Sequence, residues 1–318
     1  MIELLLLLVG FVALVFGADK LVDGASSLAA RIGIPNIVIG LTIVSLGTSA
    51  PELVVNLFAS ANENTEMVLG NVLGSNIFNV LGILGICAMI KPLVVKRNTT
   101  WIEIPLSFLA GVAVLVLAND VVLDGAPSNM ITRSEGIILL LFLSIFLVYN
   151  LMLAKKGMIG EKVETHRYTY LMASFFVIAG LAGLVIGGRL IVTNAVILAQ
   201  SFGLSERIIG LTIVSIGTSL PELATSIIAV RKNNVDIAIG NVVGSNIFNI
   251  FLVLGASTII NPVQVNPNSM FDMVLNIVAG ALLFLFIFTG KGNQLVRWEG
   301  IGLFLLYVGY MCLLVLQA

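Results

Sequence analysis

Charged residues are scarce in this sequence, and their scarcity excludes most classes of protein. Of its 318 residues, 10% are charged and 58% are hydrophobic, with a mean hydropathy of +1.10. Soluble domains carry about 25% charged residues, so a soluble globular protein is excluded. The 16 basic and 17 acidic residues nearly cancel, which leaves no excess of basic charge to bind nucleic acid or an anionic membrane surface.

Histidine and cysteine are almost absent, which argues against several kinds of metal and catalytic site. His166 is the single histidine. Cys87 and Cys312 lie far apart in apolar stretches, without the spacing of a zinc site or of a disulfide framework. No nucleophile and base occur together in a recognisable set. We therefore expect no enzymatic activity and no bound cofactor. No protein partner is evident from the sequence.

Ten apolar stretches are long enough to cross a bilayer, which takes about 20 residues per helix. They lie near residues 2–18, 33–60, 66–90, 101–119, 134–154, 170–192, 204–230, 235–260, 270–289 and 297–316. The opening Met1-Ile2-Glu3 lacks the basic flank of a signal peptide, so the first stretch is expected to remain as a span. The sequence predicts an all-α, multi-pass protein of the cell membrane with ten transmembrane helices.

The basic residues predict the orientation of these spans. All but three of them, Arg133, Arg189 and Arg207, lie in or beside loops that follow odd-numbered spans. Cytoplasmic loops carry the excess of Lys and Arg, so the odd-numbered loops are expected to face the cytoplasm. Both termini then lie outside the cell. Residues 156–169 form a cytoplasmic linker between the first five spans and the last five.

An internal repeat relates the two halves of the chain, residues 1–155 and 170–318. The segment Ile39–Ser45 recurs as Ile209–Ser215, and Gly70–Asn79 recurs with small changes as Gly240–Asn249, both at an offset of 170 residues. Five spans is an odd number, so the second copy enters the membrane from the opposite side. Inverted repeats are typical of secondary transporters, which bind their substrate near the midplane between the two copies.

The repeat contains a carboxylate deep inside an apolar span in each half. Glu52 ends the motif Gly-Thr-Ser-Ala-Pro-Glu, and Glu222 ends Gly-Thr-Ser-Leu-Pro-Glu. An unpaired charge at such a depth costs at least about 2.5–3.5 kcal/mol, which indicates a function. Pro51 and Pro221 have no N–H to donate, so each helix is expected to kink and expose backbone carbonyls to a cavity or an ion.

Polar residues at helical spacing accompany both glutamates. Those on the glutamate spans are Ser45, Thr48, Ser49 and Asn56 in the first half and Ser215, Thr218, Ser219 and Ser226 in the second; those on the next spans are Asn71, Ser75 and Asn79, with Asn241, Ser245 and Asn249. All supply hard oxygen atoms, which suit Ca2+ and Na+ rather than Zn2+ or Cu. A polar residue in a span is more often an interhelical hydrogen-bonding group than a ligand. Both interpretations stay open for Asn56 and Ser226, Asn71 and Asn241, and Asn76 and Asn246.

The other acids are predicted to be peripheral. Those near span ends or loops, and therefore expected in solvent, are Glu3, Asp19, Asp23, Glu63, Glu66, Asp120, Asp124, Asp236 and Glu299. Glu103 and Asp272 lie just inside the fourth and ninth spans, where their side chains are expected to reach toward the membrane interface.

At the motifs Gly47–Glu52 with Gly70–Asn79, and Gly217–Glu222 with Gly240–Asn249, the sequence resembles the cation/Ca2+ antiporter superfamily, most closely its prokaryotic sodium/calcium exchangers. The resemblance implies that spans 2, 3, 7 and 8 enclose the ions while spans 1 and 6 slide across them. It also implies the ligands. Ca2+ would bind the carboxylates of Glu52 and Glu222 and the backbone oxygens of Thr48 and Thr218; Na+ would bind the Ser45 carbonyl and Ser75, and the Ser215 carbonyl and Ser245; Asn79 and Asn249 would line the middle.

Asn249 departs from this pattern, because some relatives carry an acid there. Two carboxylates balance one Ca2+, whereas three Na+ would leave one excess positive charge, so the stoichiometry stays open. The alternative to Na+ coupling is a Ca2+/H+ antiporter. Proton-coupled relatives typically carry a Gly-Asn-x-x-Glu motif in place of the Gly-Thr-Ser-x-Pro-Glu found here, and His166 lies in a loop, so Na+ is favoured. A channel or receptor would need no duplicated closed site.

Overall fold

The structure is a computed structural model, and it describes residues 2–155, 168–201, 215–267, 269–289 and 292–317. In the first half the helices are α1 (Ile2–Ile32), α2 (Asn36–Ile39), α3 (Ser45–Thr48), α4 (Ala50–Ala61), α5 (Thr65–Ile77), α6 (Gly85–Ile90), α7 (Ile104–Leu117), α8 (Asp120–Leu123) and α9 (Arg133–Lys155), with π-helical segments η1 (Gly40–Val44), η2 (Phe78–Leu84) and η3 (Thr99–Glu103). In the second half they are α10 (Tyr170–Ser201), α12 (Ser215–Thr218), α13 (Leu220–Arg231), α14 (Val235–Phe248), α15 (Gly255–Ile260), α16 (Ser269–Thr289) and α17 (Arg297–Gln317), with η5 (Asn249–Leu254).

Eight of the described helical stretches are long and apolar enough to cross a membrane, and a bent pair, Asn36–Thr48 with Ala50–Ala61, makes a ninth. The predicted span 204–230 is described only from Ser215 onward, so Ile209–Val214 and Arg207 lie outside the described residues, as does most of the predicted linker, including His166. The first and sixth spans are longer than predicted: α1 continues through Asp19, Lys20 and Asp23 to Ile32, and α10 continues past residue 192 to Ser201.

The kinks expected at the two prolines are present as helix breaks two residues before each proline. Between α3 and α4 the chain leaves helical geometry at Ser49 (φ −84°, ψ 5°), and the flanking helices bend by 45°. Ser219 takes nearly the same conformation (φ −92°, ψ 10°) between α12 and α13. The proline then lies in the first turn of the next helix, where its missing N–H costs least. Each glutamate consequently lies in the first turn of a helix that begins inside the protein.

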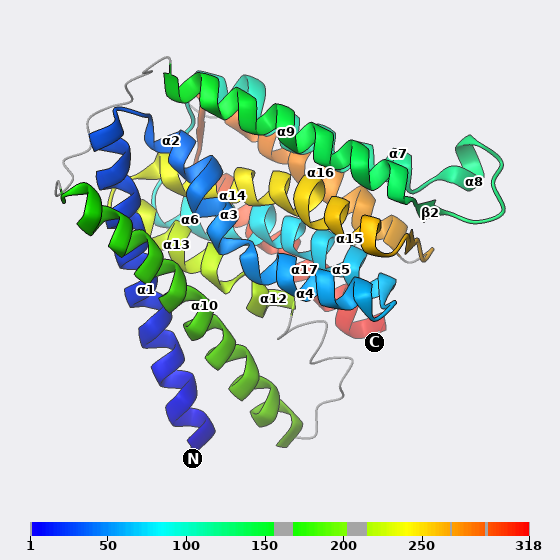
Figure 1. Cartoon of the computed structure of the whole chain (residues 1–318), viewed down its shortest axis with the longest axis horizontal. Coiled ribbons are helices and arrows are strands. Elements are labelled where there is room, and N and C mark those ends of the chain that lie inside the picture. The colour runs from blue at the N-terminus through cyan, green and yellow to red at the C-terminus, as the bar shows by residue number, and fades with distance from the viewer. Residues whose placement is uncertain (1, 156–167, 202–214, 268, 290–291, 318) are drawn as a thin grey trace.

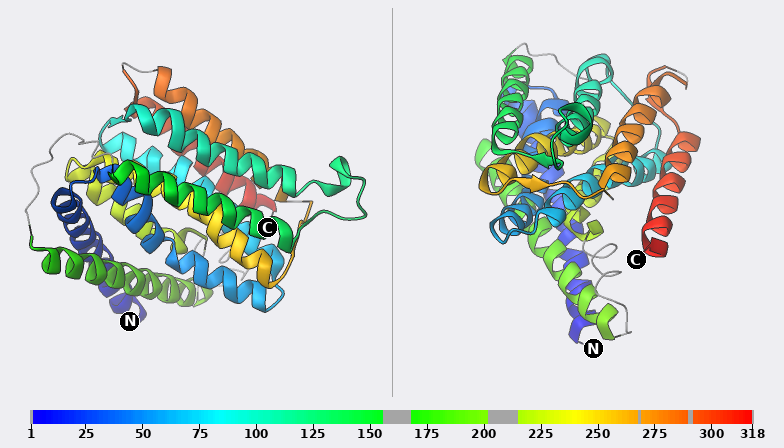
Figure 2. Two further views of the ribbon diagram at one scale, coloured as in Figure 1. Left: turned by 45° about the horizontal axis from the view of Figure 1, so that its top comes forward. Right: turned by 90° about the vertical axis from the view of Figure 1, so that its right-hand side faces the viewer.

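Helices α1 and α10 form an antiparallel pair at one side of the molecule, in the lower part of Figure 1 and again in Figure 2. Glycines make the contact possible. A Cβ placed on Gly17 would lie 2.8 Å from the Gly180 carbonyl oxygen, and one on Gly10 would lie 3.0 Å from that of Gly187. The two contacts are equivalent under the repeat offset. Close backbone approach through small residues is a common way for helices to pack in membranes.

The outer helices of each half cover the core of the other half. Helix α9 packs on α15 and η5, and α17 packs on α6 and η2. Two antiparallel strand pairs join the same partners: β1 (Leu93–Val94) with β4 (Gln294–Leu295), and β2 (Met130–Ile131) with β3 (Val263–Gln264). Arg133 donates to the Ile259 carbonyl (3.1 Å) at the end of α15. The residues at the centre belong to the spans Thr65–Ile90 and Val235–Ile260, which are the most buried.

Three acids differ from the sequence prediction. Glu299 was expected in solvent and is fully buried: its carboxylate accepts from the Val296 N–H (2.8 Å) and from the Thr289 hydroxyl, so it caps the start of α17. Glu103 was expected to reach toward the interface and instead points inward to the Tyr149 hydroxyl of α9.

Asp272 is half-buried and accepts from the Tyr310 hydroxyl of α17 (3.0 Å). The expectation that it reaches toward the interface is therefore wrong as well. The two halves show the same kind of contact. Glu103, directly before α7, bonds to a tyrosine of α9, and Asp272 of α16 bonds to a tyrosine of α17, because a neighbouring helix lies where the interface was expected.

Candidate ion-binding site

Glu52 and Glu222 lie in the first turns of α4 and α13, and both are buried, at 1% and 0% exposure. Each carboxylate is held by a serine of the other half. Ser219 Oγ donates to Glu52 Oε1 (3.1 Å), and Ser49 Oγ donates to Glu222 Oε1 (3.0 Å). Ser245 Oγ also donates to Glu222 Oε1 (3.4 Å). The helix breaks at the two serines therefore interlock the halves around the two carboxylates.

The second oxygen of each carboxylate receives no hydrogen bond from the residues that the structure describes. Glu52 Oε2 and Glu222 Oε2 are buried without a partner among the described residues, as are Asn79 Oδ1, Asn249 Oδ1 and Ser75 Oγ. Within the same part of the chain, neither glutamate pairs with a basic side chain. Leaving a buried charged acceptor unpaired is costly, on the order of 1–3 kcal/mol or more. A cation that binds these oxygens would remove the cost, so the donor set fits Ca2+ or Na+.

Four asparagines connect the middle of the two halves. Asn79 Nδ2 donates to Asn246 Oδ1 (2.9 Å), and Asn249 Nδ2 donates to Asn76 Oδ1 (3.1 Å). Asn76 and Asn246 in turn donate to each other's backbone carbonyls (3.2 and 3.4 Å). These bonds favour helix packing as the role of Asn76 and Asn246. They also fix the amides of Asn79 and Asn249, which keeps the unpartnered oxygens of that pair in the protein interior.

The threonine hydroxyls are used in interhelical hydrogen bonds. Thr48 Oγ1 donates to Asn241 Oδ1 (2.9 Å), and Thr218 Oγ1 donates to Asn71 Oδ1 (3.4 Å). Asn241 also donates to the backbone oxygen of Glu222 (3.2 Å) and to Ser226 Oγ (3.0 Å). The two threonine hydroxyls thus bond across the two halves of the chain, Thr48 to Asn241 and Thr218 to Asn71.

Packing also accounts for Asn56, whose Oδ1 accepts from Asn71 Nδ2 (3.0 Å). Ser45 is buried: its hydroxyl donates to the Thr42 carbonyl (3.3 Å), and its own carbonyl accepts from the Ser49 N–H (2.9 Å) and from the Thr48 hydroxyl (3.3 Å). Ser215 opens α12, and its side chain lies outside the described part. The structure thus brings Ser49, Ser219 and Ser245 into hydrogen-bond contact with the carboxylates.

Thr225 is a buried residue that the sequence did not single out. It lies one turn after Glu222 on α13, and its hydroxyl has no partner among the described residues. The equivalent position in the first half is Val55. Because repetition was the signal that identified the other candidates, a residue present in only one copy could not be found in this way.

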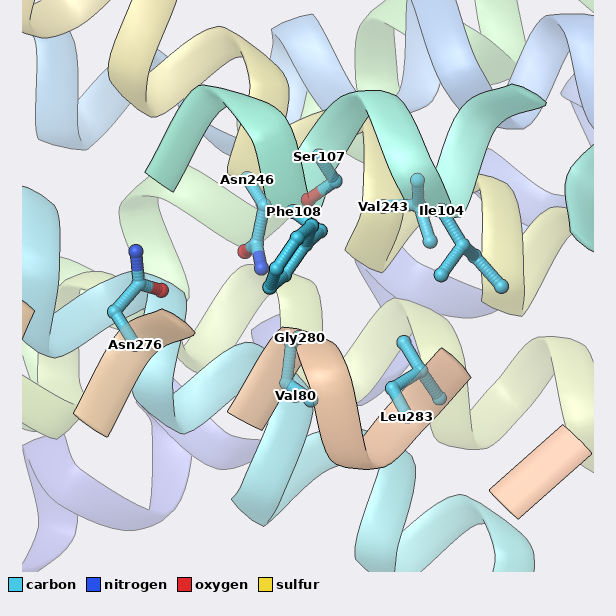
Figure 3. Close-up of a pocket in the computed structure, with 9 residues that line it drawn as sticks. All are labelled: Val80, Ile104, Ser107, Phe108, Val243, Asn246, Asn276, Gly280 and Leu283. Atoms are coloured by element: carbon cyan, nitrogen blue, oxygen red, sulfur yellow. The ribbon is translucent and has the colours of Figure 1, made fainter. Parts of the chain in front are cut away.

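A small cavity of about 10 Å3 lies behind the central asparagines, between α7 and α16. Asn246, Ser107 and Asn276 contribute polar groups to its wall, and Figure 3 shows Phe108 beside Asn246 there. Its size suits about one water molecule. Neither glutamate lines it, so this cavity is separate from the carboxylate pair, which is closely surrounded by protein.

Comparison with known proteins agrees with this arrangement. The family model for the sodium/calcium exchanger protein matches residues 2–152 and 172–316. The chain is 41% identical to inner membrane protein YrbG of Escherichia coli (82% of this chain, 81% of that protein) and 31% identical to sodium/calcium exchanger MaX1 of Methanosarcina acetivorans (98% of each). Putative antiporter CaxA of Alkalimonas amylolytica is 37% identical over 99% of each chain.

The fold is shared with a solved structure of the sodium-calcium exchanger NCX_Mj, with a TM-score of 0.83 and 29% identity over 98% of each chain. That structure was determined after soaking with Na+ in the absence of Ca2+. Family model, relatives and fold agree over nearly the whole length. The chain therefore belongs to the sodium/calcium exchanger family, multi-pass proteins of the cell membrane that act as cation/Ca2+ antiporters and not as enzymes.

Proposed function

We propose that this protein exchanges Ca2+ for Na+ across the cell membrane at a site centred on Glu52 and Glu222. One observation carries the proposal. Each buried carboxylate has one oxygen held by a serine of the opposite half and the other oxygen without a donor among the described residues. Such a pair is ready to bind a divalent cation that neutralises both charges, and it is costly to leave empty.

The proposed ligands are those that the resemblance to sodium/calcium exchangers implies. The carboxylates of Glu52 and Glu222 would bind Ca2+ together with the backbone oxygens of Thr48 and Thr218, whose hydroxyls are already used. Flanking Na+ ions would bind the Ser45 carbonyl with Ser75 on one side. On the other side they would bind the Ser215 carbonyl with Ser245. Asn79 and Asn249 would contribute their amide oxygens between them.

Exchange further requires access from each side of the membrane in turn. We propose ten transmembrane helices in two inverted five-helix repeats, residues 1–155 and 170–318, with both termini outside and residues 156–169 as a cytoplasmic linker. The paired hydrogen bonds support the inverted relation: the bond from Ser49 to Glu222 becomes that from Ser219 to Glu52 when the halves are exchanged. In inverted-repeat transporters the substrate site lies between the copies, and access alternates around it.

Proton coupling is the alternative, and flux measurements distinguish the two. In vesicles containing the purified protein, an outward Na+ gradient is expected to drive Ca2+ uptake, and Glu52→Gln or Glu222→Gln is expected to abolish it. Glu103→Gln is the matched control, because it also neutralises a buried acid but lies outside the site. Equal Ca2+ uptake driven by a pH gradient without Na+ would overturn Na+ coupling, and full activity of both glutamine variants would overturn the site.

A further inference from the structure

The helix pair α1–α10 is joined to the rest of the protein by charged groups near one end. Lys232, directly after α13, places its Nζ 2.6 Å from Asp19 Oδ1 and 2.6 Å from Asp23 Oδ1, both on α1. The same Nζ donates to the Asp19 carbonyl oxygen (3.1 Å). Asn234 Nδ2 donates to Ser26 Oγ (2.7 Å), one turn further along α1. Three side chains of one face of α1 therefore contact the short connection between α13 and α14.

These contacts are not repeated at the equivalent positions of the other half. At the repeat offset, Asp19 corresponds to Arg189, Asp23 to Thr193 and Lys232 to Asn62. Arg189 is exposed, and Asn62 donates to the Phe58 carbonyl of its own helix (2.8 Å). An arginine and an asparagine cannot reproduce an ion pair between two aspartates and a lysine. The charged contact is thus a property of the side predicted to be cytoplasmic.

Helix α13 connects this contact directly to the ion site. Glu222 lies in its first turn and Lys232 immediately after its last residue, Arg231. Helix α1 packs along α13, and Gly188 of α10 faces Pro221 at the other end of α13. While Lys232 pairs with Asp19 and Asp23, α1 and its partner α10 stay packed against α13, the helix that carries Glu222.

We propose that Lys232, Asp19 and Asp23 form a cytoplasmic latch, which stabilises the state in which the seam between α1 and α13 is closed to the cytoplasm. The proposal rests on the proposed function, since only a transporter needs to alternate between access states. The three residues are positioning residues: they act on access and do not contact the ion. The described residues at the equivalent positions, Arg189, Thr193 and Asn62, form no matching latch, so the access equilibrium is biased toward the closed cytoplasmic seam.

Loss of the latch should change the half-saturating Ca2+ concentration in opposite directions on the two sides of the membrane. When a binding-competent state becomes more populated, half-saturation on that side falls by the same factor. Lys232→Met is therefore expected to lower the ratio of cytoplasmic to external half-saturating Ca2+ by about threefold to tenfold, the range for a partly exposed ion-pair cluster. The final Ca2+ gradient should not change, because coupling to Na+ is untouched.

The matched control is Lys96→Met, measured in the same sided vesicles. Lys96 pairs with Asp236 at the start of α14, so this variant removes a charge from the same face without touching α1. The ratio is expected to stay at its original value in the control. Equal ratios in Lys232→Met and in the unaltered protein would overturn the latch, whereas a general structural defect would slow transport from both sides alike.

A cross-link tests the same contact without requiring transport. Ser26→Cys with Asn234→Cys, in a chain with Cys87→Ala and Cys312→Ser, is expected to form a mercury-bridged link in high yield, and Lys232→Met is expected to lower that yield. The link should stop exchange, and excess thiol should restore it. High yield in both chains would overturn the latch. Normal cross-linking in a protein without Na+/Ca2+ exchange would instead overturn only the proposed function.

Discussion

The contact between α1 and α10 leads to a prediction about Gly17, where the structure leaves no room for a side chain. A Cβ at this position would lie 2.7 Å from Leu184 N, 2.8 Å from the Gly180 carbonyl oxygen and 2.9 Å from the Gly183 carbonyl carbon. All three are backbone atoms, so no rotamer change relieves the overlap. Gly17→Ala therefore requires the two helices to move apart by roughly 1 Å, because non-bonded carbon contacts are optimal at about 3.5–4.0 Å.

Separation of the pair should be costly because helix association in a bilayer depends on close packing and not on the hydrophobic effect. Overpacking a tight contact costs about 1–3 kcal/mol, and a helical Gly→Ala change returns up to about 1 kcal/mol of intrinsic helix propensity. We expect a net loss of about 1–2 kcal/mol in the free energy of unfolding, measured by denaturant titration in detergent micelles. Exchange in vesicles should slow as well, if the pair moves as one body.

The control is Gly309→Ala on α17, because a Cβ there meets no atom within 4 Å. Gly309 is exposed and lies in a helix interior, so the substitution should leave stability unchanged or raise it slightly. If Gly17→Ala matches this control in both unfolding and exchange, the close backbone approach does not contribute to stability, and the description of α1–α10 as a tightly packed pair is refuted.

Three further predictions concern the polar interior. Asn249→Asp should change the Na+ dependence or the charge moved per Ca2+ more than Asn56→Ala does, because it adds a third carboxylate; flux with the membrane potential clamped measures both. Asn241→Ala removes acceptor and donor groups that bind Thr48, Ser226 and Glu222; we expect a loss of about 1–3 kcal/mol in unfolding titrations. Tyr149→Phe removes the donor to Glu103 and should cost a similar amount, while Ca2+ half-saturation stays unchanged.

Much of the fold follows from apolar length and repetition. Nearly all predicted spans appear as helices with ends close to those expected, because a run of about 20 apolar residues leaves few alternatives in a bilayer. The first and sixth spans were predicted too short, the first because Asp19 and Asp23 were taken to end it. These acids instead stay helical and pair with Lys232, which is a tertiary contact that no local pattern reveals.

The same reason explains the errors at buried acids. Glu103 and Glu299 lie near span ends, where solvent or the interface is the usual environment, but neighbouring helices or strands cover them. For Glu299 a local signal exists. Val296 directly precedes α17, and Glu299 lies three residues after it, which is the position of the acid in a capping box. Thr132 and Glu135 show the same spacing and the same bond at the start of α9 (2.6 Å).

At the candidate site, repetition identifies the residues but not their partners. Ser49 and Glu52 lie on one helical stripe, which suggests that they act together. The structure instead pairs Ser49 with Glu222 and Ser219 with Glu52. That exchange of partners depends on how the inverted halves meet, which requires the three-dimensional arrangement.

Repeated and unrepeated residues are expected to have two different kinds of role in a transporter built from two inverted repeats. Residues present in both copies, such as Glu52 and Glu222, can face the same ion in either access state, because exchanging the halves restores the same surroundings. Residues present in one copy, such as Lys232, differ in environment between the two states and so stabilise one of them. Ion chemistry is therefore expected at the positions that repeat, and bias between inward and outward access at those that do not.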